Sequence, residues 1–276
     1  MNNTKEIIEI NMNGAVTKAN LKLSKMFLLG ILAGMIIALG AATSNTATHS
    51  ITDVGLSRAL TGAIFPVGLI MIVFTGGELF TGNCLMIMSV MDKRIRLTQL
   101  LRNLVVVFFS NLVGSLIIVF LINYCGNLDY TSGTLGAYTI KIAIGKVSIT
   151  PLKGVLSGIL CNILVCVAIL MATAAKEAVG KIFAIWFPIS AFVIGGFEHI
   201  VANMYYIPAG MVAAMNPTYA AKAQELYGIS TEQLNQLSIS GLLSNFIPVT
   251  IGNILGGMVF VGCLIYYVNV RADKNN

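Results

Sequence analysis

Charged residues are scarce in this chain of 276 residues: they make up 10% of it, while apolar residues make up 57%. The mean hydropathy is +0.85. An average soluble domain contains about 25% charged residues, so the composition excludes an ordinary soluble protein. Because roughly 20 apolar helical residues cross a hydrocarbon core about 30 Å thick, the composition predicts an integral membrane protein.

Cysteine and histidine are also rare, with five and two residues respectively. The cysteines form no C-x-x-C pair, and their spacing suits neither a disulfide framework nor a zinc site. We therefore expect no metal and no other cofactor. Basic stripes with interleaved aromatics, which are typical of nucleic-acid binding, are missing as well. The net charge of +6 thus does not indicate a nucleic acid partner.

Six apolar stretches are long enough to span a membrane as helices, and glycines interrupt the second and the fifth. They are residues 25–44, 58–90, 98–125, 150–175, 181–215 and 241–270. We predict an all-α membrane protein with one six-helix channel domain at 24–271 and a short cytoplasmic tail at 272–276. Between the last two spans, 216–240 should form an outer loop with a short helix from Thr231.

The polar segment 1–23 precedes the first span, which is too far from the N-terminus for a cleaved signal peptide. Apolar residues recur in it at spacings of three to four, as in Ile8, Met12, Ala15 and Ala19. This pattern predicts an amphipathic helix that lies on the membrane surface or plugs a cytoplasmic opening. A partly ordered polar leader is the alternative.

The distribution of lysine and arginine predicts the orientation. Twelve of the 17 lie in the N-terminal segment, the 91–102 loop, the 175–181 loop and the tail. The other side carries five: Arg58, Lys141, Lys146, Lys153 and Lys222. The positive-inside rule therefore places both termini in the cytoplasm, with the protein in the inner (plasma) membrane of the cell.

Each half of the chain contains a pair of glycines followed by an acid. The first break spans Phe74–Gly82 and contains Glu78; the second spans Val193–Ile200 and contains Glu198. Paired glycines weaken a helix, and a carboxylate is expensive within a membrane. Breaks at matching places in two halves indicate a transport site near the bilayer midplane.

Two further landmarks recur around these breaks in the same order. A G-x-x-x-G motif, a Phe-Pro pair and an Asn-x-x-Gly motif appear once in each half: Gly30–Gly34, Phe65-Pro66 and Asn111–Gly114, then Gly154–Gly158, Phe187-Pro188 and Asn253–Gly256. Spans 1–3 and 4–6 are therefore expected to be two copies of one unit. Because three spans is an odd number, the copies should have opposite topology.

Side chains at the breaks suggest anion chemistry. Exposed N–H groups and half-helix N-termini favour an anion. Thr81 offers a hydroxyl, and His199 is the one side chain within the spans that changes charge near neutral pH. An anion beside His199 could take its proton and leave as a neutral acid. The alternative is a neutral core histidine that is hydrogen-bonded to a carbonyl.

The two acids need partners, because an unpaired buried carboxylate costs several kcal/mol. Candidate partners are Lys146, Asn162 and the amides of the broken loops. We expect Glu78 and Glu198 to brace these loops rather than to contact a substrate. The aromatics Phe65, Phe80 and Phe192 are candidates for apolar gates.

Three motifs resemble the formate/nitrite transporter family: Gly76–Thr81, Gly196–Met204 and Ile247–Gly257. The resemblance covers all six spans. It implies an aquaporin-like helical fold and a homopentamer with a pore through each protomer. It also implies passage of small monovalent weak-acid anions, with formate first and nitrite or hydrosulfide close behind.

The resemblance also assigns roles to single positions. The pore centre falls on His199, Thr81 and Asn253, and loop bracing or anion attraction falls on Asn162 and Lys146. The gates fall on an outer set, Phe65, Leu69 and Phe192, and a cytoplasmic set, Leu79, Phe80 and Val165. One departure concerns the first break, where Glu78 follows paired glycines and relatives have Ala-Asp.

Two other functions remain as alternatives. An aquaporin-like channel for neutral solutes would need Asn-Pro-Ala signatures at the breaks, where this chain has glycines and acids. An intramembrane hydrolase would pair Ser157 with His199, but Gly154 lies too early for a G-x-S-G turn. A channel rather than an enzyme is therefore expected.

Overall fold

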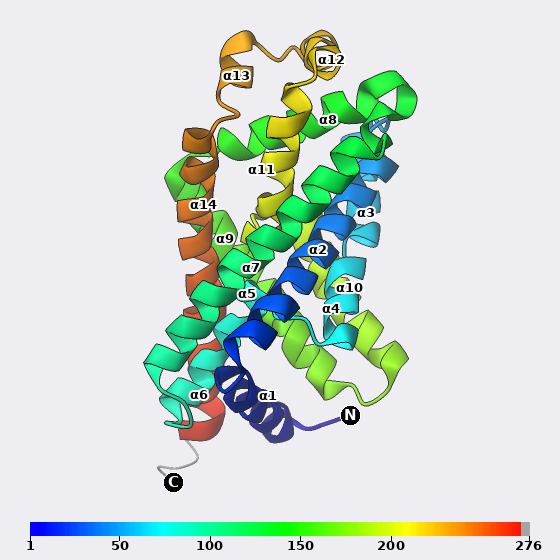
Figure 1. Ribbon diagram of the computed structural model, residues 1–276. Helices are drawn as coiled ribbons and strands as arrows, with labels where there is room; N and C mark the ends of the chain where they lie inside the picture. Colours follow the sequence, from blue (N-terminus) through cyan, green and yellow to red (C-terminus); the bar gives the residue numbers. More distant parts are fainter. Residues whose placement is uncertain (272–276) are drawn as a thin grey trace.

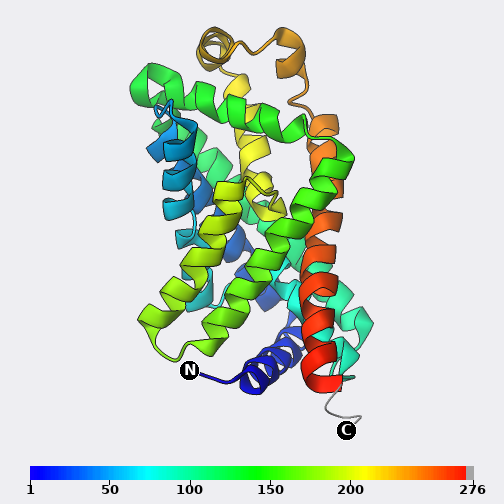
Figure 2. The same ribbon diagram turned by 180° about the vertical axis from the view of Figure 1, so that it is seen from behind.

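Long apolar helices running between two faces make up most of the molecule (Figures 1 and 2). The computed structural model describes residues 1–271, so the predicted tail at 272–276 lies outside the described part. Within it, six segments are long and apolar enough to span a membrane, and no strand occurs. They are α2 (Leu23–Thr48), α3–α4 (Val54–Ile64 and Val67–Thr75), α7 (Leu97–Tyr124), α9 (Pro151–Ala174), α10 (Ala178–Gly195) and Ile239–Arg271.

The sixth span is a composite element. It begins as α14 (Ile239–Ile254), continues as the π-helix η3 (Leu255–Cys263) and ends as α15 (Leu264–Tyr266) and η4 (Tyr267–Arg271). Its end lies at the same face of the bundle as the N-terminus (Figure 1). An even number of spans explains this arrangement, and the all-α six-span prediction is confirmed.

The first broken segment changes direction twice. Pro66 separates α3 from α4, and α4 ends at Gly76, whose φ of 72° is left-handed. That conformation favours glycine because it has no Cβ. The chain then crosses in extended form through Leu79 and resumes as α5 (Phe80–Asn83), η1 (Cys84–Met86) and α6 (Ile87–Met91).

The second broken segment repeats this sequence of conformations. Helix α10 ends at Gly196, with φ 70°. His199 is extended and forms the N-cap of α11 (Ile200–Ala214). Helices α5 and α11 lie on opposite sides of the middle of the bundle (Figure 1). The two copies of the unit are therefore inverted, as the repeat pattern predicts.

Shorter helices cover both ends of the bundle. At the end with the termini lies α1 (Thr4–Ala19), which buries Ile8, Met12, Ala15 and Ala19. The predicted amphipathic helix is therefore present, and its apolar side packs against the rest of the bundle. Helix α8 (Tyr130–Val147), with a kink at 131–133, crosses the opposite end (Figures 1 and 2). The loop there contains α12 (Pro217–Tyr227) as well as α13 (Thr231–Asn235). Neither α8 nor α12 was expected.

Glycines allow the long helices of each repeat to touch through their backbones. A Cβ at Gly114 of α7 would overlap the carbonyl of Ile31 in α2, and one at Gly256 of η3 would overlap the carbonyl of Ile159 in α9. These two glycines belong to the recurring Asn-x-x-Gly motifs. The close packing is thus the same in both halves.

Replacing Gly114 by valine is expected to destabilise the fold, because the backbones of α2 and α7 must separate. Overpacking of this kind costs about 1–3 kcal/mol. Thermal unfolding in detergent should show a lower midpoint. Gly14→Ala is the control, since no atom lies within 4 Å of the added Cβ. Equal midpoints for Gly114→Val and wild type would contradict the packing argument.

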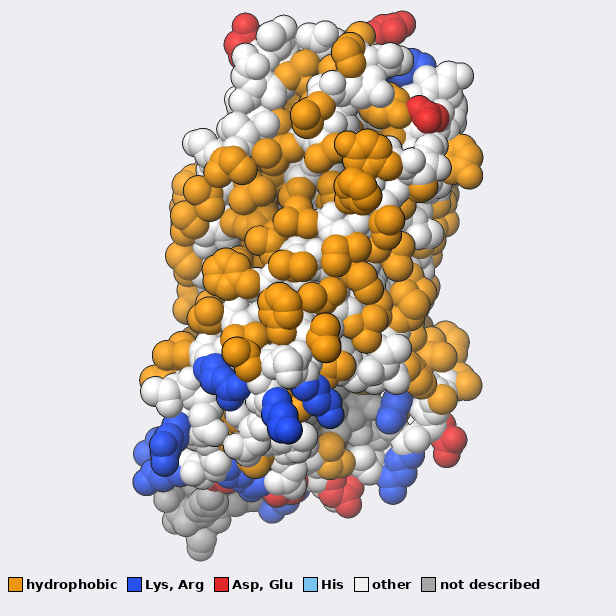
Figure 3. All heavy atoms as spheres, viewed as in Figure 1, with side chains coloured by type: hydrophobic (Ala, Val, Ile, Leu, Met, Phe, Trp, Pro, Cys, Tyr) orange, Lys and Arg blue, Asp and Glu red, His pale blue; other side chains and the backbone are white. Residues whose placement is uncertain are grey.

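The surface fits a membrane environment. On the face shown in Figure 3, apolar side chains form a broad belt across the middle of the molecule, and lysine and arginine gather at the end where α1 lies. Large apolar residues such as Phe109 and Phe120 on α7 are more than half exposed. Such a belt is the surface that contacts lipid acyl chains.

Candidate functional site

Two cavities enter the bundle from opposite ends and share no lining residue. We call the one reached from the face with α8 the outer cavity and the one beside α1 the inner cavity, as names for the two ends of the bundle. The outer cavity has a volume of about 480 Å³ and includes Phe65, Phe192 and His199 in its wall. The inner cavity, of about 320 Å³, lies beside α1 and includes Leu69 and Leu79. Buried side chains separate the two cavities.

Between the two cavities the two broken segments meet in a buried polar contact. His199 Nε2 lies 2.9 Å from Thr81 Oγ1. The exposed fraction is 3% for His199 and 0% for Thr81. We call this His199–Thr81 contact the waist. It joins the start of α11 to the start of α5.

A second bond of the ring defines its tautomer. The backbone N–H of Ala202 donates to His199 Nδ1 at 3.1 Å. A ring nitrogen that accepts a hydrogen bond carries no proton, so the proton of the neutral ring lies on Nε2 and is donated to Thr81. The partner of Nε2 is a hydroxyl and the ring borders a cavity, unlike a core histidine bonded to a carbonyl.

Two aromatic rings cover the waist on its outer side. Phe65 and Phe192 meet edge to face, with centroids 5.7 Å apart. Phe192 also stacks on His199, with centroids 5.8 Å apart and an interplanar angle of 24°. A solute in the outer cavity therefore meets an apolar pair immediately before the imidazole.

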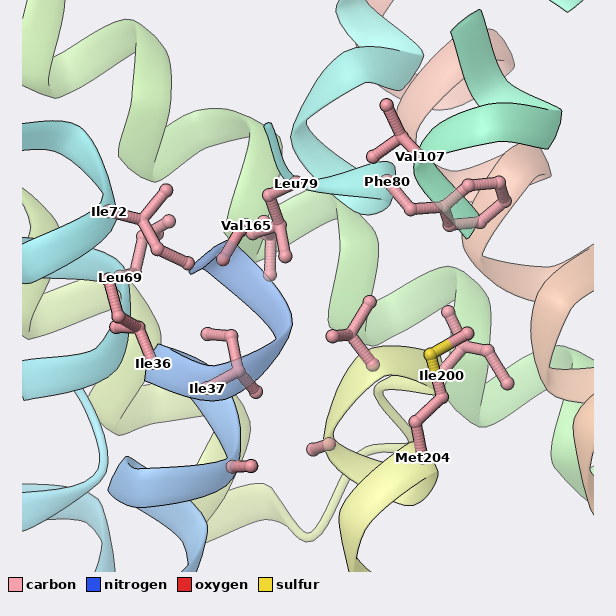
Figure 4. Close-up of a cluster of buried hydrophobic side chains, with 14 of the residues drawn as sticks. Ile36, Ile37, Leu69, Ile72, Leu79, Phe80, Val107, Val165, Ile200 and Met204 are labelled. Atoms are coloured by element: carbon pink, nitrogen blue, oxygen red, sulfur yellow. The ribbon is translucent and has the colours of Figure 1, made fainter. Parts of the chain in front are cut away.

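The remaining gate candidates divide differently from the prediction. Leu69, expected in the outer gate, lines the inner cavity together with Leu79, because it lies one helical turn inward of Phe65. Val165 is 1% exposed and belongs to the same buried hydrophobic cluster as Leu69 and Leu79. Figure 4 shows it next to Leu79. Phe80 points away from Leu79 (Figure 4) and packs on Phe108, with centroids 5.3 Å apart.

The acid of the second break has a lysine and two amides as partners. Lys146 Nζ lies 2.6 Å from Glu198 Oε1. Asn203 and Asn245 donate to Oε2 at 2.7 and 3.3 Å. In addition, the backbone N–H of Glu198 donates to Ser157 Oγ at 3.0 Å. Ser157, the nucleophile of the hydrolase alternative, therefore braces the loop.

The acid of the first break has the same set of partners. Lys18 Nζ of α1 lies 3.0 Å from Glu78 Oε1, and Asn83 and Asn103 donate to Oε2 at 2.7 and 3.3 Å. Sequence reasoning missed Lys18, which was counted only as a charge of the N-terminal segment. It also missed the four asparagines, although each repeat has one five residues after its acid and another eight residues before its Asn-x-x-Gly motif.

Asn253 anchors the second broken loop rather than lining the pore. Its Nδ2 donates to the carbonyls of Gly158 and Glu198, both at 2.9 Å. Its Oδ1 accepts from the N–H of Ile200 at 2.9 Å. It is fully buried and lines neither cavity.

Two other asparagines complete the anchoring of the loops. In the first repeat, Asn111 bonds the carbonyls of Gly30 and Glu78 and the N–H of Phe80 at 2.8–3.0 Å. Asn162 donates to the carbonyls of Thr81 and Asn253 at 3.2 and 2.6 Å. No carboxylate of the described residues is its partner. Asn162 thus braces the first broken segment and joins the two repeats, which agrees with the loop-bracing role that the resemblance implies; it does not pair with an acid.

At the inner cavity, ionic contacts fix α1 to the bundle. Arg94, in the loop before α7, forms a bidentate pair with Glu9 at 2.6 and 2.8 Å and also bonds Asn13 at 3.0 Å. Asn11, further along α1, reaches Thr173 Oγ1 of α9 at 3.1 Å. These contacts hold α1 across the cavity that it lines.

Replacing Arg94 by glutamine is expected to loosen α1 at neutral pH. The hydrogen bond from Arg94 lowers the pKa of Glu9 below its usual value near 4.5. A lowered folded-state pKa stabilises docking above that usual value, and the gain is lost as the pH falls through the lowered one. The pair is partly exposed, so the effect is within about 1 kcal/mol.

Amide hydrogen exchange in α1 checks this expectation. Exchange should be faster in Arg94→Gln than in wild type at neutral pH, and the difference should vanish at a pH where Glu9 is protonated. Lys93→Gln serves as the control, because it removes a neighbouring cation. Equal exchange at neutral pH would show that the pair does not hold α1.

The bundle is an inverted six-span repeat in which two half-helices meet at a buried polar contact between two cavities. This arrangement defines a membrane channel or transporter. The chain belongs to the formate/nitrite transporter family, whose profile matches residues 5–267. This is a family of transport proteins and not of enzymes.

Relatives match over nearly the full length. The chain is 38% identical to a "Probable formate transporter" of Methanothermobacter thermautotrophicus, covering 93% of each chain. It is 36% identical to "Formate channel FocA" of Haemophilus influenzae, covering 93% of this chain and 90% of the relative. FocA of Escherichia coli is 33% identical, with 95% and 92% covered.

Solved structures show the same fold. A "Pentameric formate channel with formate bound" matches with a TM-score of 0.77 at 34% identity, covering 89% of this chain and 97% of the other. An "FNT family ion channel" matches at 0.82 and 26% identity, with 96% and 99% covered. The aquaglyceroporin of Plasmodium falciparum, at 0.50 and 12% over 92% and 98%, is similar in fold alone.

Proposed function

We propose that the protein conducts small monovalent weak-acid anions across a membrane, with formate as the main permeant and nitrite and hydrosulfide close behind. The observation that carries this proposal is the His199–Thr81 waist beneath the Phe65–Phe192 pair, between two cavities. Relatives named formate channels support formate as the first choice.

The proposed mechanism alternates charged and neutral forms of the permeant. Lys146 and the other cations of the outer cavity raise the local concentration of anions. The Phe65–Phe192 pair then favours the neutral acid, because an ion loses its hydration among apolar rings. The anion takes up one proton before this pair and releases it on the far side.

His199 acts in this scheme through Nε2–H. The ring already accepts a bond at Nδ1, so a second proton enters it only if the bond to Ala202 breaks. The neutral ring donates a hydrogen bond to the permeant in place of Thr81. Water in the cavity supplies the exchanged proton near His199.

The remaining roles follow from position. Glu78, Glu198, Lys18 and the asparagines hold the broken loops; Leu69, Leu79 and Val165 narrow the inner side. We propose a homopentamer, as in the formate channel of similar structure, with lipid around the apolar belt. Both termini and segment 1–23 lie in the cytoplasm, consistent with the cations at that end (Figure 3).

A panel of solutes in proteoliposomes tests the proposal. Formate, nitrite and hydrosulfide should each enter faster than in protein-free liposomes, whereas glycerol should not. Glycerol entry without entry of any of the three anions would instead support a neutral-solute channel.

A further inference from the structure

Arg58 lies at the wall of the outer cavity, and the mechanism above uses it only as one of several cations that attract anions. It comes from the first turns of α3, and its Nη1 donates to the carbonyl of Ile194 at 3.1 Å. Ile194 is in the last turn of α10, where a cation also meets the negative end of the helix dipole. Among the described residues no other group accepts from this guanidinium, so its Nε and Nη2 donors stay available to the cavity.

The second break provides space for the guanidinium. A Cβ at Gly196 would lie 2.6 Å from Arg58 Nη1. Gly196 is glycine because of its left-handed φ of 70°, and the end of the flexible Arg58 side chain lies close to it. The guanidinium is thereby positioned beside the loop that carries His199.

Charge distinguishes the outer cavity from the inner one. Three cations line the outer cavity, Arg58, Lys141 and Lys146, with Glu198 as the one carboxylate. Lys146 is paired with that carboxylate at 2.6 Å, and Lys141 lies over the ring of Tyr227 at 4.5 Å from the centroid. Arg58 is thus the one guanidinium among the three cations of this cavity. In the inner cavity, Lys18 and Glu78 balance each other.

The repeat does not duplicate this feature. Aligning the two Phe-Pro pairs places Arg58 opposite Gly180, which is followed by Lys181. Neither residue is an arginine. A guanidinium beside a broken loop is therefore a property of the outer half alone.

We propose that Arg58 makes the outer cavity a binding site for planar oxyanions, so that carboxylate and nitrite ions are preferred over a spherical anion such as hydrosulfide at entry. This inference rests on the proposed function and names the part that selects among its permeants. A guanidinium offers two parallel N–H groups that match two oxygens, whereas an ammonium or a spherical anion makes no such pair. The oxyanion is bound on the outer side of the Phe65–Phe192 pair, and this binding raises the occupancy of the waist by the permeant.

Entry kinetics of two variants test the proposal. Initial uptake is measured in right-side-out and inside-out membrane vesicles, with formate and with hydrosulfide as probes. Arg58→Gln should raise the KM for formate by roughly tenfold from the outer side, with the maximal rate unchanged. For hydrosulfide the KM should rise by less than about threefold, because only the point charge is lost.

The conservative variant separates charge from geometry. Arg58→Lys keeps the charge and should restore the KM for hydrosulfide while the KM for formate stays several-fold high. Lys153→Gln is the matched control, since it removes an exposed cation of the same face that does not line the cavity. From the inner side all variants should match wild type.

The outcomes separate the failure of this inference from that of the function. A wild-type KM for formate in Arg58→Gln would overturn the inference and leave the channel function intact. An equal fall in the maximal rate for both anions, in either vesicle type, would also overturn the inference. Such a fall would mean that Arg58 only braces α10. Absence of flux of both anions in the wild type would refute the proposed function itself.

Discussion

Phenylalanine in place of His199 is expected to abolish proton-coupled formate uptake at acidic pH. The substitution keeps a planar ring under Phe192 but removes Nε2–H, the donor that lies 2.9 Å from Thr81. A buried polar group that loses its hydrogen-bond partner costs about 1–3 kcal/mol. Because each 1.36 kcal/mol is a factor of ten in rate, the flux should fall by roughly 10- to 100-fold. Uptake into proteoliposomes with an internal pH dye measures it.

Two variants control for other effects of the substitution. His49→Phe removes the other histidine, which lies at the outer end of α2 and bonds Thr131, and should leave the flux unchanged. His199→Asn retains an amide donor and should keep part of the flux. An unchanged pH-dependent flux in His199→Phe would contradict the proposed role of its Nε2–H as a donor to the permeant.

Alanine in place of Asn253 is expected to disorder the second broken loop. The carbonyls of Gly158 and Glu198 and the N–H of Ile200 would lose their partner at once. Each unsatisfied buried group costs about 1–3 kcal/mol, so the loss over three groups is roughly 3–9 kcal/mol. An apparent unfolding midpoint about 10 °C lower is expected in detergent, together with loss of flux at every pH.

A second asparagine of the same span provides the control. Asn269→Ala removes a bond to Ile265 within one turn of helix and should change neither quantity. Asn111→Ala, the equivalent change in the first repeat, should resemble Asn253→Ala. A stable Asn253→Ala with wild-type flux would contradict the anchoring role of these amides.

The breaks and the inverted repeat were predictable because their signals are local. A left-handed helix end requires glycine, and Gly76 and Gly196 stand at such ends. Asn-x-x-Gly combines a loop anchor with a close helix contact, so its recurrence marks equivalent positions in two repeats. His199 and Thr81 were singled out by their place at the breaks and again by the family resemblance, whereas their contact depends on the packing of two distant segments.

Positions that depend on side-chain direction were harder to assign. Asn253 and Phe80 lie beside the broken loops, but the sequence does not tell whether a side chain faces a cavity or a neighbouring helix. Lys18 pairs with Glu78 across 60 residues, a contact without any spacing signal. Helix α8 was missed because glycines at 133, 136 and 145 obscure its apolar face.

The coupling of formate and proton entry tests the central claim most directly. In sealed proteoliposomes held at zero membrane potential, a formate gradient should acidify the interior much faster than in protein-free liposomes, and faster at acidic than at neutral external pH. Acidification no faster than in protein-free liposomes would contradict a pathway in which the neutral acid crosses the waist between the two cavities.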